Sequence, residues 1–276
     1  MARKYPQTPA VRVMGKAFRL DEVNPGASTP FAQKYNDGDE ARPRLSILRK
    51  RLCELQELLY AEHNRSLLIV LQAMDTGGKD GLIENLLTGV NPAGVQVATF
   101  KAPSVEELNH DFLWRIHAYT PKRGHIGVFN RSHYEDVLIT RVHGLIDKKT
   151  CTRRYDDINN FEELLTHNGT RILKFFLHIS KDEQASRLQA RLDDPSKNWK
   201  FDPSDLKERV NWSKYQHAYE DAVRHCSPPD APWFVVPANH KWARDLAITE
   251  IVVAELEAMK IKPPIIDFDP KKIVIV

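Results

Sequence analysis

The chain has 276 residues, and its 42% hydrophobic and 28% charged content is typical of a folded domain with a sizeable core. Lys and Arg number 40 against 37 Asp and Glu, and the formal net charge of +3 gives no indication of a nucleic-acid partner. Three cysteines without a CxxC spacing argue against a disulfide framework or structural zinc site, and no apolar stretch reaches the roughly 18 residues of a membrane span.

The first 43 residues predict an extended arm, because prolines, glycines and polar residues are frequent there. No apolar run follows the basic opening residues, so we expect no secretory signal, no membrane partner and a cytoplasmic protein. From Arg44 onward, leucines recur at helical spacing and predict an amphipathic helix. We expect residues 44–276 to form a single domain.

Short apolar runs then alternate with helical patterns, and they lie at 67–72, 95–100, 126–130, 172–178 and 233–236. Strands separated by helices favour βαβ crossovers and a parallel sheet with both faces covered. The sequence therefore predicts an α/β fold with a largely parallel, five-stranded sheet. Ser104 and Glu107 form a capping-box pattern that predicts the start of one intervening helix. The apolar tail PPIIDFDPKKIVIV is interpreted as packing on the body or on another subunit.

The stretch LLIVLQAMDTGGKDG predicts a strand that runs into a phosphate-binding loop. Gly77, Gly78 and Gly81 would let backbone N–H groups approach an anion at the start of the next helix. Lys79 follows the glycine pair as the lysine does in the usual pattern G-x-x-x-x-G-K-[ST]. A plain strand–turn–helix connection with an exposed lysine is the alternative.

This loop departs from the usual pattern at two positions. Ala73 replaces the first glycine, and Asp80 replaces the Ser or Thr after the lysine. A carboxylate beside phosphates is costly unless a divalent cation lies between them, and Asp75 adds a second one. The pair suggests a metal site that handles dense negative charge, although turn chemistry could also explain an aspartate, Asp75 more readily than Asp80.

The segments AMDTGGKDG and FNRSHYEDVL, with further blocks at 100–117, 188–222 and 231–242, resemble the polyphosphate kinase 2 family over nearly the whole chain from about residue 40. The resemblance implies a P-loop kinase-like, three-layer αβα fold with a helical lid. It also implies phosphate transfer between inorganic polyphosphate and nucleotides with Mg²⁺ or Mn²⁺, and assembly as dimers or tetramers. Asp75, Lys79 and Asp80 match the family's Walker A positions, so the missing hydroxyl is expected.

The resemblance also assigns the residues that follow the third predicted strand. Asn130 occupies the Walker B-like position, where many members carry Asp, and an amide binds metal less strongly than a carboxylate does. Members with the FNRSHYE version resemble those that accept nucleoside monophosphates as well as diphosphates. Arg131 would stabilise charge on the moving phosphoryl group, with a structural ion pair as the alternative. Glu135 and Asp136 are candidates for positioning metal or nucleotide, or are simply carboxylates at a helix start.

Residues 181–214 predict a helix, a loop broken by prolines and a second helix, with basic residues in each part. A closing lid over phosphates requires such a segment, because closure excludes water. Arg187 and Arg191 should share one helix face, and the resemblance makes Arg191, Lys197 and Lys200 phosphate contacts. A solvated helical face with ion pairs is the alternative.

Polyphosphate is a flexible polyanion, so its affinity should come from several Lys and Arg contacts. Five basic residues are candidates for lining its path, namely Lys101, Arg115, Lys122, Arg123 and Arg141. Direct in-line transfer needs no covalent enzyme intermediate, so we expect no essential histidine nucleophile. The expected function is a polyphosphate:AMP/ADP phosphotransferase. The alternatives are an ATP-dependent small-molecule kinase and a non-catalytic polyanion- or nucleotide-binding protein.

Overall fold

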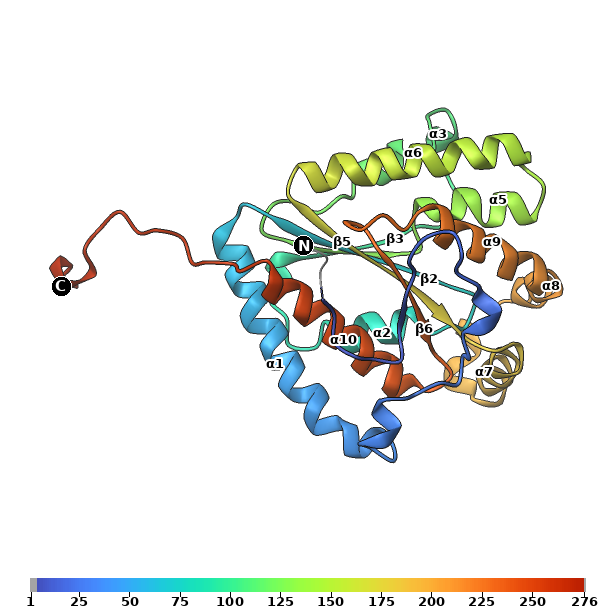
Figure 1. Cartoon of the computed structure of the whole chain (residues 1–276), viewed down its shortest axis with the longest axis horizontal. Helices are drawn as coiled ribbons and strands as arrows, with labels where there is room; N and C mark the ends of the chain where they lie inside the picture. The colour runs from blue at the N-terminus through green and yellow to red at the C-terminus, as the bar shows by residue number, and fades with distance from the viewer. Residues whose placement is uncertain (1–3, 276) are drawn as a thin grey trace.

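A computed structural model describes residues 4–275 and contains one six-stranded sheet in the order β1-β6-β5-β2-β4-β3 (Figure 1). The strands are β1 (Val11–Arg12), β2 (Ser66–Ala73), β3 (Val95–Thr99), β4 (Ile126–Asn130), β5 (Thr170–His178) and β6 (Trp233–Pro237). Strands β2 to β6 are parallel, and β1 pairs with β6 in the antiparallel direction. The predicted parallel strands are thus confirmed, and the arm adds a short sixth one.

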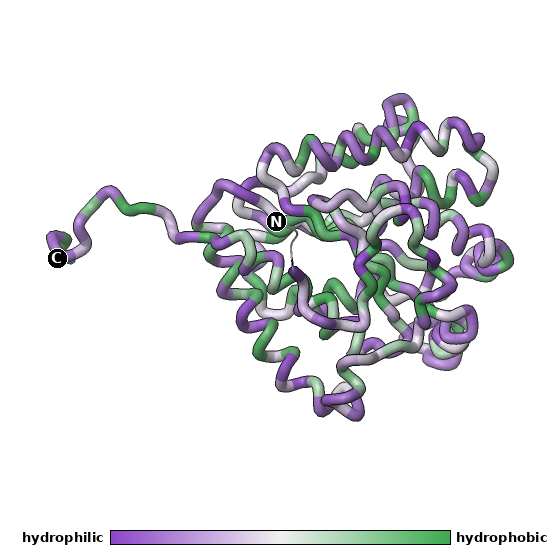
Figure 2. Tube along the Cα trace, in the orientation of Figure 1, coloured by the Kyte–Doolittle hydropathy of each residue, from purple (hydrophilic) through white to green (hydrophobic). Residues whose placement is uncertain are grey.

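The central strand β2 is buried along its whole length and separates two cores. Leu67, Ile69 and Leu71 pack on one face, and Leu68 and Val70 pack on the other, because successive side chains of a strand point to opposite faces. Figure 2 shows the hydrophobic residues concentrated along these strands and the helix faces that cover them. The structure therefore has the three-layer αβα architecture that the sequence resemblance implied.

Helices α1 (Gly38–Glu62), α2 (Lys79–Leu86) and α10 (Lys241–Ala258) cover one face of the sheet (Figure 1). Helices α5 (Ile139–Val142), α6 (Lys148–His167) and α9 (Trp212–His225) cover the other, together with the 3-10 helix η4 (His133–Val137). None of the helices in residues 4–275 has the length and apolar content of a membrane span.

The predicted lid consists of α7 (Lys181–Asp193), the 3-10 helix η5 (Pro195–Lys200) and α8 (Ser204–Val210), as the broken helical pattern indicated. The capping box of Ser104 and Glu107 is present, but its helix α3 (Val105–Leu108) ends after one turn, and α4 (Trp114–His117) follows separately. The remaining short elements are the 3-10 helices η1 (Leu20–Glu22), η2 (Phe31–Gln33), η3 (Pro92–Gly94) and η6 (Pro270–Lys272).

The N-terminal segment differs from the expected arm in two ways. Helix α1 begins six residues before Arg44, where the Asp37 side chain accepts hydrogen bonds from the backbone N–H groups of Asp39 and Glu40. Pro43 lies inside this helix, although a proline usually marks a helix boundary. The preceding residues also pack onto the domain, because Val13, Leu20 and Phe31 are buried in the two cores.

The C-terminal tail does not pack on the body, which corrects one of the two interpretations of its apolar character. After α10 the chain runs away from the domain (Figure 1). The side chains of Ile265 and Ile275 are 99% and 95% exposed. Among the described residues, neither hydrophobic core includes a side chain from residues 265–275.

Candidate functional site

A cavity of about 900 Å³ lies at the carboxyl ends of the parallel strands, where ligands bind in open α/β sheets. Its walls come from the loop after β2, the ends of β3 and β4, the lid and the first turn of α10. The parallel strand order brings these segments together, although they are separated by up to 169 residues along the chain, from Asp75 to Arg244. A volume of this size can hold a nucleotide and part of a second anion.

The loop after β2 has the close backbone approach of an anion-binding turn. A Cβ added to Gly77 would lie 2.4 Å from the Cβ of Ala73, so no side chain fits there. Gly78 has φ +94° and is the N-cap of α2, and Thr76 also adopts a left-handed φ of 62°. The first N–H groups of α2 therefore face the cavity without partners in their own helix.

Gly81 differs from the other two predicted glycines. It lies within α2, and a Cβ added there would meet no atom within 4 Å. Gly81 lines the cavity, so any requirement for glycine comes from a ligand and not from the fold.

Two carboxylates of the loop are each held by a residue at the end of β4. The Arg131 guanidinium lies 2.7 Å from Asp75 Oδ1, and Asn130 Nδ2 donates to Asp80 Oδ1 at 2.7 Å. The Walker B-like position thus orients Asp80 in this structure. Arg131 has a left-handed φ of 62°, which is a strained conformation for a residue with a side chain.

Lys79 lies between these groups with 9% of its surface exposed, and its Nζ is 3.3 Å from the carbonyl oxygen of Ala73. Burial and then the nearby Arg131 lower the pKa of this ammonium, while Asp75, Glu135 and Asp80 oppose the shift. Burial likewise raises the pKa of Glu135, against the attraction of Arg131 and Lys79. Sequence-distant charges that act on one another in this way form a single electrostatic cluster.

The lid contributes further predicted residues. Arg191, Lys197 and Lys200 line the cavity, and the exposed ring of Trp199 lies among them. Arg191 Nη1 donates to the carbonyl oxygen of Lys200 at 2.7 Å and lies 3.6 Å from Asp205 Oδ2. Neither lysine is buried; the Lys197 ammonium pairs with Asp194, and the Lys200 Nζ lies 5.0 Å from the centre of the Trp199 ring.

Arg187 also lines the cavity, but its donors already have partners. Its Nη1 donates to the carbonyl of Thr76 at 3.1 Å, its Nη2 donates to the carbonyl of Ala238 at 2.6 Å, and its Nε contacts Glu183 at 2.7 Å. Arg187 thereby ties the lid to the phosphate-binding loop and to the segment after β6.

Residues 35–264 match the family Polyphosphate kinase 2 (PPK2). The chain belongs to this family. It is 48% identical over 94% of its length to the AMP/ADP-polyphosphate phosphotransferase of Meiothermus ruber, of which 96% is covered. It is 43% identical to the ADP-polyphosphate phosphotransferase of Rhodopseudomonas palustris over 92% of this chain and 93% of the relative. The crystal structure of polyphosphate kinase 2 from Arthrobacter aurescens TC1 superposes with a TM-score of 0.91 at 45% identity, covering 98% and 96% of the two chains.

Four of the predicted substrate-binding residues do not line the cavity of this polyphosphate kinase 2 domain, namely Arg115, Glu135, Asp136 and Arg141, and the path candidates Lys122 and Arg123 do not line it either. Arg115 is buried and donates to the carbonyl of Lys101 at 2.8 Å, so it supports Lys101, which does line the cavity. Asp136 lies beside Arg115 and Arg154, and burial raises its pKa to about 6 against the pull of these two arginines. Neither side chain lines the cavity in this structure.

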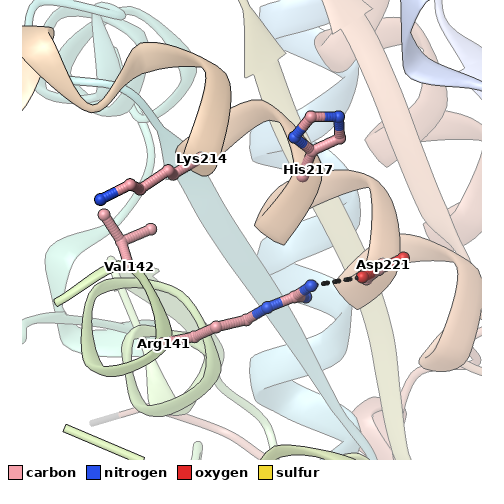
Figure 3. A pocket seen from close by; sticks show the side chains of 5 residues that line it. All are labelled: Arg141, Val142, Lys214, His217 and Asp221. Atoms are coloured by element: carbon pink, nitrogen blue, oxygen red, sulfur yellow. Dashed lines mark ion pairs between the residues drawn. The ribbon is translucent and has the colours of Figure 1, made fainter. Parts of the chain in front are cut away.

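Arg141 lies in a different place, between α5 and α9. It pairs with Asp221 at 2.7 Å in a separate cavity of about 410 Å³ that Lys214 and His217 also line (Figure 3). The polyphosphate path predicted through Arg141 therefore does not coincide with the cavity at the P-loop.

Sequence reasoning missed two cations of the site, Lys241 and Arg244, in the first turn of α10. Both residues follow β6 closely in the sequence. Because ligands bind at the carboxyl ends of parallel strands, residues just after the last predicted strand were candidates for the site. In the sequence, the basic residues of 181–214 are the more conspicuous group.

The carboxylates fit a divalent cation that shares its coordination with substrate. Phosphotransfer in kinases generally requires such an ion, and Mg²⁺ is usually bound by one or two carboxylates together with waters and phosphate oxygens. Asp75 and Asp80 supply two carboxylates at the phosphate-binding loop. Among residues 4–275, no three His, Cys, Asp or Glu side chains gather into a protein-only metal site. This donor set suits an ion that arrives with phosphate.

Proposed function

We propose that this chain transfers phosphoryl groups directly between inorganic polyphosphate and AMP or ADP. The observation that carries the proposal is the cluster of Asp75, Lys79, Asp80 and Arg131 at one cavity that is large enough for both anions. Membership of the polyphosphate kinase 2 family and the printed activities of the two relatives support the same substrates.

Each group of the cluster has a role in this proposal. The N–H groups at the start of α2 and the Lys79 ammonium bind the phosphoryl group that moves, and Arg131 stabilises the charge that spreads over its oxygens. Asp75 and Asp80 hold Mg²⁺ or Mn²⁺, which neutralises charge on both substrates when bound. Asn130 keeps Asp80 in place through its 2.7 Å hydrogen bond.

The lid completes the site. Arg191, Lys197 and Lys200 close over the phosphates, and water is thereby kept from the phosphoryl group during transfer. Attack by an oxygen of the nucleotide's terminal phosphate on the end of the polyphosphate breaks one phosphoanhydride bond and forms another. The shortened chain leaves with the displaced oxygen, so no covalent enzyme intermediate is needed, and the reverse reaction uses the same groups.

One assay separates this proposal from its two alternatives. Protein is incubated with Mg²⁺, polyphosphate and either AMP or ADP, with no other phosphoryl donor, and nucleotides are measured by chromatography. We expect ADP from AMP and ATP from ADP. An ATP-dependent small-molecule kinase would form neither product, and a non-catalytic binding protein would show salt-sensitive binding without turnover.

We further propose that the chain forms a homo-oligomer and works in the cytoplasm. The support for assembly is a set of exposed apolar side chains in the tail, namely Ile265, Ile266, Phe268, Ile273, Val274 and Ile275. The support for a reducing compartment is that Cys53, Cys151 and Cys226 are all free thiols.

A further inference from the structure

Strand β3 is the last strand at one side of the sheet, and its outer edge is open. It pairs with β4 in continuous register, and no other strand of residues 4–275 lies beyond it. Its sequence, VQVAT, has no charged residue and no proline. Proteins usually protect an edge strand with charges, prolines or bulges, because its outward N–H and C=O groups can pair with another strand. The outer edge of β3 has none of these protections.

Exposed apolar side chains flank this edge on both faces of the sheet. On the face that α1 covers, Val97 is 46% exposed, and Tyr60 of α1 is 41% exposed. The Tyr60 ring lies at the start of β3, since a Cβ added to Gly94 would be 3.1 Å from it. On the other face, the Tyr119 ring lies 5.6 Å from that of Phe100, the residue that follows β3. An added strand would therefore gain side-chain contacts as well as backbone hydrogen bonds.

The C-terminal tail has the properties of such a strand. Ile273, Val274 and Ile275 are all exposed, and Ile273 already has an extended backbone with φ −89° and ψ 120°. β-Branched residues favour strands, where Ile273 and Ile275 would point to one face and Val274 to the other. Figure 2 shows hydrophobic residues along this otherwise hydrophilic segment. The tail thus supplies a strand without a sheet, and β3 supplies an edge without a strand.

The course of the tail favours a second copy of the chain as the partner. After α10 the tail runs away from its own domain (Figure 1). Residues 261–272 can span at most about 40 Å, which is enough to reach the edge of a neighbouring domain. Each copy carries one open edge and one tail, so a dimer with two-fold symmetry pairs both edges with both tails. A single copy placed on a different protein would satisfy only one of each.

We propose that the tail of one copy adds as a strand to the outer edge of β3 in a second copy, and that the exchange is reciprocal. Residues 273–275 then form backbone hydrogen bonds with β3, and their side chains cover Val97 and its aromatic neighbours. This inference specifies the interface of the homo-oligomer proposed above and rests on that proposal. Val97 does not line the substrate cavity, so the interface does not include the phosphate site.

Cross-linking tests whether tail and edge meet in different copies. Val97→Cys and Val274→Cys are introduced together in a Cys53→Ser background, because Cys151 and Cys226 are buried. A bismaleimide reagent then joins nearby thiols, and a denaturing gel shows whether the joined thiols belong to one chain or two. We expect a covalent dimer with the double-cysteine chain and loss of that dimer with either cysteine alone. Val210→Cys, an exposed valine on the lid helix α8, replaces Val97→Cys in the matched control and should give no dimer.

A charge on the edge tests the same interface without a reagent. Val97→Lys places an ammonium where the strand should add, so we expect the mass in solution to fall about twofold or more, as after deletion of the tail. Val97 is partly exposed, so the variant should fold, which thermal unfolding at high dilution checks. Val210→Lys should keep the wild-type mass, and ATP formation by Val97→Lys should persist.

The outcomes separate this inference from the proposals on which it rests. An oligomer that keeps its mass in Val97→Lys, or a double-cysteine chain that is cross-linked only within one copy, would overturn the tail-to-edge interface and leave the homo-oligomer standing. A wild-type chain that is monomeric at every concentration would refute both. Absence of ATP formation by an oligomeric wild-type chain would refute the proposed activity and leave the interface unaffected.

Discussion

At the residue scale, the departures from the usual phosphate-binding loop have a structural explanation. Asp80 stands where a neutral hydroxyl is common, and the structure gives it a neutral partner, the amide of Asn130. Asp75 instead accepts a hydrogen bond from the positively charged guanidinium of Arg131. A positive charge thus offsets Asp75, whereas Asp80 has only a neutral partner. An Asp at position 130 would add a third negative charge at the same loop.

Arg131 and Lys79 should each be essential for turnover. Arg131→Ala and Lys79→Ala remove the two cations that the proposed mechanism places on the transferred phosphoryl group, so we expect kcat to fall by about 10²–10³ or more. Steady-state ATP formation measures the loss, and circular dichroism with thermal unfolding confirms that the variants remain folded. Lys149→Ala serves as the control for loss of a lysine. Wild-type kcat in either site variant would remove that residue from the mechanism.

At the scale of elements, a buried charge network supports the segment that carries Arg131. Lys174, in the middle of β5, donates to Glu162 of α6 and, at 2.9 Å, to the hydroxyl of Tyr134. Glu162 Oε1 also accepts the Tyr134 hydroxyl at 2.9 Å, and all three side chains are fully buried. Helix η4, which carries Tyr134, begins two residues after Arg131, so the network anchors the segment that follows this arginine.

Breaking this network from one side should destabilise the domain. Lys174→Met leaves the Glu162 carboxylate buried without its cation, so we expect a loss of about 3–5 kcal/mol in the free energy of unfolding. The double variant Lys174→Met with Glu162→Leu should recover a large part of this loss, since it removes both charges. Urea unfolding of wild type, both single variants and the double variant measures the coupling. Equal, additive losses would show that the pair is not coupled.

The lid carries a carboxylate whose titration should be visible in stability. Asp205 has a pKa raised to about 6, first by burial and then by repulsion from Asp75, although Arg191 opposes the shift. A carboxylate with a raised folded-state pKa favours folding below its unfolded pKa, and this contribution is lost as the pH rises through about 6. Asp205→Asn should therefore be more stable than wild type at pH 8, and the advantage should shrink as the pH falls below about 6 and disappear below the ordinary aspartate pKa of 3.8. Thermal unfolding of both proteins across this range tests the sign.

At the scale of the whole molecule, the C-terminal tail from residue 263 combines an apolar sequence with exposure to solvent. Its isoleucines and Val274 are exposed, whereas buried strands elsewhere in the chain use the same residue types. Exposed apolar surface of this kind usually marks an interaction site.

Deletion of residues 263–276 should therefore change assembly and leave the domain intact. Light scattering after size-exclusion chromatography would report a smaller species than for the full chain, and the thermal unfolding temperature at high dilution would stay near that of the full chain. A full chain that is monomeric at all concentrations would refute the proposed homo-oligomer.

Strand positions and the sheet class could be predicted from the sequence because buried parallel strands require continuous apolar runs, as in residues 67–72. Two features of the arm could not. The strand Val11–Arg12 has only two residues and therefore no periodic pattern. Helix α1 begins at the cap formed by Asp37 and continues through Pro43, which a sequence pattern would read as a helix boundary. In both places the local sequence pattern is weak, and packing against the rest of the domain decides the structure.

The chemistry of the phosphate-binding loop is local, so nine consecutive residues were enough to indicate an anion site with an unusual carboxylate after its lysine. Which distant charges join that loop depends on strand order and on the face that each helix turns to the sheet. Only the tertiary structure buried Arg115, placed Arg141 in a second cavity and brought Lys241 and Arg244 to Gly78. The physical reason is that Coulomb interactions act through space, and spacing along the chain does not determine distance between residues so far apart.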